Sequence, residues 1–191
     1  MTTTYFFFFF ITVLLHSCHT LMGADDFVRP MDRSLLGLNN EEKVSYFKLY
    51  WHDIVSGKTP SSVEVIPATN KVNTTAFFGS VSILDNPLTL GPTLSSKLVG
   101  RAQGFYASAG QTEVDLLMAM NFAFIEGKCN GSSITIMGRN PSIFNKTKEL
   151  AVIGGSGFFR FARGYAKLKT YSLNLNTGDA IVEYNVYVIH Y

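Results

Sequence analysis

The sequence has few charged residues, and this shortage already excludes several classes of protein. Only 16% of the 191 residues are Asp, Glu, Lys or Arg, whereas an average globular domain has about 25%. The formal net charge is +2 and the basic residues are scattered, so no nucleic-acid-binding surface is predicted. Hydrophobic residues make up 47% of the chain, enough to build a core, which excludes disorder of the whole chain.

Cysteine is almost absent. The chain has two cysteines, and Cys18 lies in an apolar N-terminal segment that we expect to be removed. Cys129 is then the single cysteine left, so no internal disulfide is predicted and the core must supply the stability. A catalytic thiol needs a histidine beside it to lower its pKa. We therefore interpret Cys129 as a small, partly buried residue before a turn at Asn130 and Gly131.

Histidine is also scarce, which argues against metal and hydrolase sites. The chain has four histidines, and only His52 and His190 lie beyond residue 24. With the scattered carboxylates, they lack the spacing of metal ligands. His52 and Asp53 are neighbours, so in a strand their side chains point to opposite faces, and no Gly-x-Ser-x-Gly motif supplies a nucleophile. We expect no metal ion and no cofactor.

The one long apolar run lies at the N-terminus. Residues 5–15 match the hydrophobic core of a secretory signal peptide and are too short to span a bilayer as a helix. Gly23 and Ala24 offer a cleavage site. We expect residues 1–24 to be a signal peptide and residues 25–43 to be a flexible leader, with no membrane segment after cleavage.

Three Asn-x-Ser/Thr sequons follow the expected signal peptide, at Asn73, Asn130 and Asn145. A further asparagine, Asn140, has a serine at the required spacing, but Pro141 between them excludes glycosylation there. Each sequon alone is weak evidence. Three of them behind a signal peptide predict a secreted glycoprotein.

Phenylalanine, tyrosine and glycine are abundant, with 16, 9 and 16 copies, and such residues favour strands, turns and bends. Short apolar runs between turn signals predict eight or nine strands. These cover residues 44–55, 63–66, 76–84, 98–106, 116–125, 134–137, 150–153, 158–171 and 180–191. Residues 85–87 are predicted to form a turn. A helix over residues 114–124 is the weaker alternative for that segment.

Many antiparallel strands without helices form either a sandwich or a barrel. Gly104, Gly157 and Gly164 sit within segments of strand-like composition, which favours bends at the corners of a barrel. We predict a single all-β domain over residues 44–191. Aromatic side chains inside a barrel either fill its core or line a pocket for a flat phenolic ligand.

The glycine-rich residues 154–157 invite comparison with phosphate-binding loops. Such a loop needs a following helix whose N-terminus faces the phosphate. Here an aromatic segment with strand character follows, so we interpret these residues as a hairpin turn.

Asp53 is the candidate for chemistry. It lies in an aromatic strand segment, residues 50–54, and burial among apolar neighbours raises the pKa of a carboxylic acid. Such an acid can donate a proton to a phenol or to a leaving hydroxyl. A structural hydrogen bond or a solvent-facing strand end is the alternative. Arg101 is either a partner or a surface charge, and we favour the second.

Five blocks of sequence resemble the plant dirigent proteins. They are Tyr50-Trp51-His52-Asp53-Ile54, Asp-Asn-Pro-Leu-Thr at 85–89, residues 96–106 with Gly-Arg-Ala-Gln-Gly, residues 152–157 with Gly-Gly-Ser-Gly, and Ala-Arg-Gly at 162–164. The resemblance covers residues 44–191. It implies an eight-stranded antiparallel β-barrel of the dirigent and allene-oxide-cyclase type, secreted to the plant apoplast as a homo-oligomer, either a trimer or a dimer.

The resemblance also implies a function. In such proteins an external oxidase, a laccase or peroxidase, makes phenoxy radicals from a monolignol such as coniferyl alcohol. The barrel orients the radicals so that one enantiomer of a lignan forms, without redox chemistry of its own. We expect this stereoselective coupling. A non-catalytic barrel that binds phenolics or belongs to the cell wall is a further alternative.

Part of the resemblance is to the branch that includes pterocarpan synthases, which are lyases that dehydrate an isoflavanol through a quinone methide. It is carried by residues 120–124, 138–140 and 159–166. Lignan-forming members have an aspartate where this chain has Asn140, an arginine where it has Lys148, and a disulfide pair that is missing here. Isoflavanol dehydration is therefore the alternative function.

The resemblance and the residue pattern together give a set of site residues. Asp53 is the expected catalytic acid. The expected lining of the substrate pocket comprises Tyr106, Phe124, Asn140 and Lys148.

Overall fold

The structure is a computed structural model, and it describes residues 27–69, 71, 76–141 and 148–191. The expected signal peptide lies outside these described residues. The chain divides into two units, the first ending at Asn39 and the second comprising Asn40–Tyr191. Within the described ranges, no helix has the length and hydropathy required to cross a membrane.

The first unit contains a short 3-10 helix, η1 (Arg33–Leu36), in the segment predicted to be a flexible leader. The Asp32 carboxylate caps it by accepting a hydrogen bond from the Ser34 N–H at 2.8 Å. Gly37 ends it at φ 71°, a left-handed conformation that glycine adopts at little cost. Asp, Ser and Gly at these positions explain why the helix forms here.

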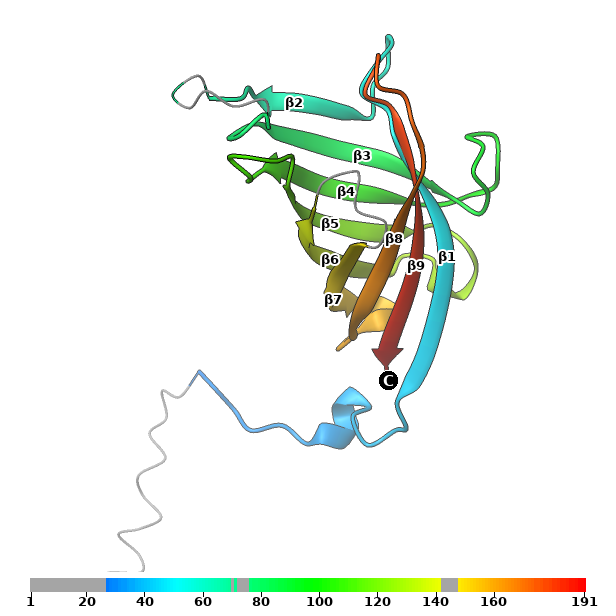
Figure 1. Cartoon of the computed structure of the whole chain (residues 1–191). Coiled ribbons are helices and arrows are strands. Elements are labelled where there is room, and N and C mark those ends of the chain that lie inside the picture. Colours follow the sequence, from blue (N-terminus) through cyan, green and yellow to red (C-terminus); the bar gives the residue numbers. More distant parts are fainter. Residues whose placement is uncertain (1–26, 70, 72–75, 142–147) are drawn as a thin grey trace, which may run out of the picture. The chain divides into compact units, whose positions relative to one another are not determined.

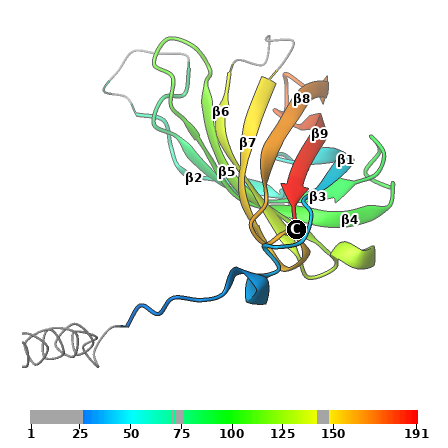
Figure 2. The ribbon, with the colours of Figure 1, turned by 90° about the horizontal axis from the view of Figure 1, so that it is seen from below.

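The second unit is a closed antiparallel β-barrel (Figure 1). Its strands are β1 (Lys43–Asp53), β2 (Ser62–Ile66), β3 (Val81–Thr89), β4 (Leu98–Ser108), β5 (Leu116–Phe124), β6 (Ser133–Asn140), β7 (Lys148–Ser156), β8 (Arg163–Leu173) and β9 (Ala180–His190). They pair in the order β1-β9-β8-β7-β6-β5-β4-β3-β2, and β1 also pairs with β3. This last pairing closes a ring of eight strands, β1 and β3–β9. Figure 2 shows β1 beside β3 at the closure.

The predicted eight-stranded antiparallel barrel is confirmed. The helical alternative for residues 114–124 is wrong because β5 lies there.

Residues 85–87 lie inside β3, so the turn predicted there is wrong. The start of β3 pairs with β2, and its end pairs with β1, where Trp51 is opposite Leu88. The Asp85 N–H donates to the Ser61 carbonyl at 2.8 Å, and Pro87, two residues on, faces the same edge. A proline is tolerated there because β3 changes partner at this point and no ladder bond needs its missing N–H.

The segment 158–171, predicted as one strand, begins instead with a turn. β7 ends at Ser156, a 3-10 helix η3 (Gly157–Phe159) follows, and β8 starts at Arg163. No α-helix follows the glycine-rich residues, in agreement with the rejection of a phosphate-binding loop. The hairpin interpretation is right only in part, because Gly154, Gly155 and Ser156 belong to β7 and the turn begins at Gly157. Gly157 lies in this turn at φ 59°, not inside a strand as predicted. Gly104 does lie within β4, where a Cβ atom would be 2.2 Å from the Ala119 carbonyl oxygen.

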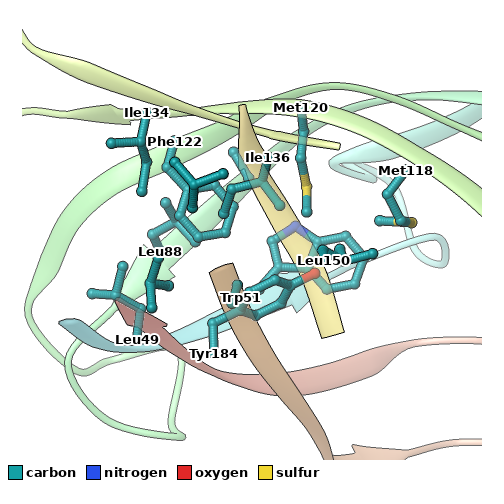
Figure 3. Packing of buried hydrophobic residues seen from close by; sticks show 14 of the residues in the cluster. Leu49, Trp51, Leu88, Met118, Met120, Phe122, Ile134, Ile136, Leu150 and Tyr184 are labelled. Atoms are coloured by element: carbon teal, nitrogen blue, oxygen red, sulfur yellow. The ribbon is translucent and has the colours of Figure 1, made fainter. Parts of the chain in front are cut away.

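Alternate residues of the eight strands of the ring point into the barrel and form the core (Figure 3). The largest fully buried side chains include Tyr184, Phe122, Phe159, Leu88, Met118 and Met120. Each contributes about 1.5–3 kcal/mol by leaving water. The core fills the middle of the barrel and leaves cavities at its two ends, which we call the Asp53 end and the Phe124 end after the last residues of β1 and β5.

Candidate functional site

The Asp53 end of the barrel holds a cavity of about 670 Å³, within the 300–1,000 Å³ typical of ligand sites. Its polar lining includes the side chains of Asp53, Ser62, Ser82 and Tyr106. Its apolar lining includes Phe77, Leu116, Leu173 and Leu175. A few polar groups clustered on one side of an apolar hollow suit a flat, mostly apolar ligand that carries hydroxyl groups.

Strand alternation places Asp53 in this cavity. In β1, Leu49 and Trp51 point into the core, and Asp53 follows on the same face. His52 points the other way, and its Nε2 lies 2.7 Å from the Thr89 hydroxyl. The opposite orientation predicted for His52 and Asp53 is therefore confirmed, and the two do not form a catalytic pair.

Asp53 is almost fully buried, with 9% of its surface exposed. Burial raises the pKa of its carboxyl above the ordinary value, and hydrogen bonds from Ser62 and Asn86 partly oppose the rise. The Ser62 hydroxyl donates to Asp53 Oδ1, and Asn86 Nδ2 donates to the same oxygen at 3.1 Å. Such a carboxyl holds its proton to a higher pH than a free aspartate does, which suits a general acid.

Tyr106 stands beside Asp53 on the inner face of β4. Burial, followed by the Asp53 charge, raises the pKa of its phenol to about 12. The phenol therefore stays protonated at physiological pH, and its hydroxyl interacts with Ser82, Ser62 and Asp53. The site thus combines a carboxylic acid and a phenol, both available for hydrogen bonds to a ligand oxygen.

Asn140 and Lys148 lie at the end of β6 and the start of β7, which antiparallel pairing places at the Asp53 end. Lys148 is only 5% exposed, and burial lowers the pKa of its ammonium group. The Asn140 Oδ1 is buried and has no hydrogen-bond partner within the described part of the chain. Both lie at the Asp53 end of the barrel, but neither is among the residues that line the cavity of about 670 Å³, and no described contact joins either of them to Asp53.

Phe124 lies at the opposite end of the barrel. Its ring stacks on the Phe47 ring, with centroids 5.2 Å apart, and contacts the Phe159 ring, with centroids 5.6 Å apart. These contacts place it in the core above a smaller cavity of about 240 Å³. The structure therefore does not bring Phe124 together with Asp53 and Tyr106.

The remaining predicted residues lie on the surface or outside the described residues. Asn130 is exposed, whereas Asn73 and Asn145 lie outside. Arg101 Nε donates to the exposed Asp85 Oδ1 at 2.6 Å, so the surface interpretation of Arg101 is confirmed. Cys129 is partly buried, as predicted, and burial raises the pKa of its thiol.

Ser62 and Asn86 contact Asp53 directly, and neither was predicted from the sequence. Asn86 was hidden because residues 85–87 contain Asp, Asn and Pro, a composition typical of turns. The signal that could have found it is the alternation of Ser82, Leu84, Asn86 and Leu88. That period of two continues through the supposed turn and places Asn86 inside the barrel.

A closed eight-stranded barrel with such a cavity defines a class of small β-barrels that can hold one small ligand. The family model described as "Dirigent-like protein" matches residues 44–189, which is almost the whole barrel unit. The chain therefore belongs to the dirigent-like family, as its sequence blocks indicated.

Relatives and solved structures agree with this assignment. The chain is 50% identical over 167 residues to Dirigent protein 7 of Arabidopsis thaliana, covering 87% of each. It is 46% identical over 165 residues to Pterocarpan synthase 1 of Glycyrrhiza echinata, covering 86% of this chain and 87% of the relative. A solved structure of a pterocarpan synthase dirigent protein matches with a TM-score of 0.76 and 44% identity, covering 86% of this chain and 89% of that one.

Proposed function

We propose that this barrel binds a small plant phenolic and catalyses its dehydration to a quinone methide, followed by stereospecific ring closure. The observation that carries the proposal is the buried Asp53 carboxyl in the wall of the cavity, with its pKa raised by burial. Relatives named pterocarpan synthases, together with Asn140 and Lys148 in place of the aspartate and arginine of lignan-forming members, support dehydration over radical coupling.

The proposed step needs one acid and no redox partner. Asp53 donates its proton to the leaving hydroxyl, the carbon–oxygen bond breaks, and water departs as the substrate phenol loses its proton. A second hydroxyl then adds to the quinone-methide carbon and gives its proton to the Asp53 carboxylate, while the quinone-methide oxygen regains a proton. The net change is the loss of one water. The Tyr106 hydroxyl is placed to hold a substrate oxygen beside Asp53.

Stereoselective coupling of phenoxy radicals made by an external oxidase is the second candidate. The cavity of about 670 Å³ favours it, because this volume lies in the upper half of the usual range for ligand sites and leaves room for more than one aromatic ring system. In that reaction the protein contributes orientation alone.

Parallel assays test the two candidates. One incubates the protein with isoflavanols, and the other with coniferyl alcohol and a laccase, each followed by chiral chromatography. We expect dehydrated, enantiomerically pure product in the first assay and a loss of about 10²–10⁴-fold in rate for Asp53→Asn. Asp85→Asn, at an exposed carboxylate, is the matched control and should keep full activity. Unchanged isoflavanol would rule out dehydration, and binding of phenolics without product in either assay would favour a non-catalytic barrel.

We also propose that the protein is secreted, N-glycosylated and homo-oligomeric. The exposed position of Asn130 supports glycosylation there. Exposed apolar side chains on β3, β4 and β6, namely Ile83, Phe105 and Met137, support self-association. Expression in plant cells tests this: apoplastic fluid should contain the protein, Asn130→Gln should lower its mass by one glycan, and light scattering should give a multiple of the monomer mass.

A further inference from the structure

Asn86 occupies an unusual position for an amide. It is fully buried, in the middle of β3, at the point where this strand leaves β2 and joins β1. Its Nδ2 donates to Asp53 Oδ1 at 3.1 Å and to the Ser62 hydroxyl at 3.0 Å. Its Oδ1 accepts from the Ser61 hydroxyl and faces the Ser62 hydroxyl at 3.1 Å. A buried amide with partners on both ends is held in one orientation.

The direction of the hydrogen bonds between Ser62, Asn86 and Asp53 follows from the number of protons that each group can donate. The Ser62 hydroxyl has one proton, which cannot serve Asp53 Oδ1 and Asn86 Oδ1 together. Because Ser61 already donates to Asn86 Oδ1, the Ser62 proton is free for Asp53 Oδ1. Asp53 Oδ1 then receives two donors, one from Ser62 and one from Asn86 Nδ2.

A protonated carboxyl group has one oxygen that accepts hydrogen bonds and one that carries the proton. A proton on Oδ1 would face both donors, so Oδ1 is the accepting oxygen. We propose that Asn86 and Ser62 are positioning residues that keep the transferable proton of Asp53 on Oδ2, the oxygen that neither of them contacts. The Tyr106 hydroxyl also hydrogen-bonds Asp53, so a ligand oxygen would meet this proton beside the phenol. The inference rests on the proposed acid role of Asp53 and adds to it the device that orients the acid.

The hydrogen bonds from Ser62 and Asn86 also affect the pKa of Asp53. Hydrogen bonds to a carboxylate stabilise its ionised form, so removing one of them should raise the Asp53 pKa further. Other titratable groups face Asp53 from neighbouring elements: Tyr106 from β4, Asp179 from the segment before β9, and Tyr184 from β9. Glu64 of β2 lines the same cavity. All of them remain in a Ser62 variant, in which Asp53 loses one donor and Tyr106 loses its contact with the Ser62 hydroxyl.

The experiment compares Ser62→Ala, Ser62→Thr and Asn86→Ala with the wild type, with Ser133→Ala as control. Ser133 belongs to a similar hydroxyl pair, 2.7 Å from Ser156, at the Phe124 end. The Asp53 pKa is measured by carboxyl ¹³C NMR titration, which needs no substrate, and kcat and KM for an isoflavanol are measured against pH. If Asn86→Ala does not fold, the comparison of Ser62→Ala with Ser62→Thr tests the positioning role.

We expect the Asp53 pKa and the falling alkaline limb of kcat to move up by about one unit in Ser62→Ala. We also expect kcat below that limb to drop about tenfold at similar KM. Ser62→Thr should restore both, and Ser133→Ala should change neither. An Asp53 pKa that is the same in Ser62→Ala and wild type overturns the positioning role. A wild type without turnover overturns the proposed function instead, while the NMR titration still decides whether the two donors act on Asp53.

Discussion

Trp51 and Tyr184 meet edge to face inside the barrel, with ring centroids 6.3 Å apart and planes at 68° (Figure 3). The Trp51 indole N–H and the Tyr184 hydroxyl are buried, and neither has a hydrogen-bond partner among the residues that the structure describes. An unpaired buried polar group costs about 1–3 kcal/mol. The core is therefore built partly from aromatic side chains whose polar atoms reduce its stability.

Removing only the hydroxyl of Tyr184 should not destabilise the protein. We expect Tyr184→Phe to keep or raise the free energy of unfolding, by up to about 1 kcal/mol, because the ring stays and an unpaired polar atom is lost. Tyr184→Ala should cost about 3–5 kcal/mol through the cavity that it leaves. Urea denaturation measures both. A loss of more than about 1 kcal/mol in Tyr184→Phe would show that the hydroxyl has a partner.

Asp53 should give the stability a recognisable pH dependence. Because burial raises its pKa above the ordinary 3.8, the folded protein keeps a proton that the unfolded chain has released. The contribution of Asp53 is therefore fully present below the unfolded pKa and declines as pH rises through the folded pKa. Asp53→Asn removes this titration, so its free energy of unfolding should fall less than that of wild type between about pH 4 and 7.

The control for this measurement is Asp85→Asn. The hydrogen bond from Arg101 lowers the Asp85 pKa, so this residue contributes stability above the unfolded pKa and loses it as pH falls. The two variants should therefore change the pH profile in opposite directions. Identical profiles for Asp53→Asn and wild type would show that Asp53 titrates as a free aspartate.

Gly104 should not tolerate a side chain. A Cβ atom there would lie 2.2 Å from the Ala119 carbonyl oxygen and 2.7 Å from Met120 Cα, and backbone cannot move aside cheaply. We expect Gly104→Ala to cost about 3 kcal/mol or more. Gly154→Ala is the control, since nothing lies within 4 Å of its Cβ position. Thermal unfolding measures both, and equal melting temperatures would contradict the prediction.

Arg101 should matter little, although it lies in one of the sequence blocks that resemble the dirigent proteins. Its ion pair with Asp85 is exposed to solvent on both sides, and exposed pairs contribute about 0–1 kcal/mol. We expect Arg101→Ala to keep the catalytic rate and to lose at most about 1 kcal/mol of stability. A large loss of turnover at unchanged stability would instead assign Arg101 to the site.

The sequence by itself determined the family, favoured a barrel over a sandwich, and placed His52 and Asp53 on opposite faces of one strand. Each depends on local pattern: alternation along a strand decides which face a side chain takes, and motif blocks keep their order along the chain. Local pattern also explains one error. Asp-Asn-Pro at 85–87 has the composition of a turn, and only the pairing of these residues with β4 makes them part of a strand.

Only the tertiary structure decided which residues share a site. Ser62 and Asn86 are 9 and 33 positions from Asp53 in the chain, and no local spacing links them. The closure of β1 onto β3 brings them into contact and buries the Asp53 carboxyl. Likewise, Phe124 and Tyr106 both point inward, but strand direction places them at opposite ends of the barrel. The pKa of Asp53 is thus a property of the closed barrel, because it depends on desolvation and on donors from other strands.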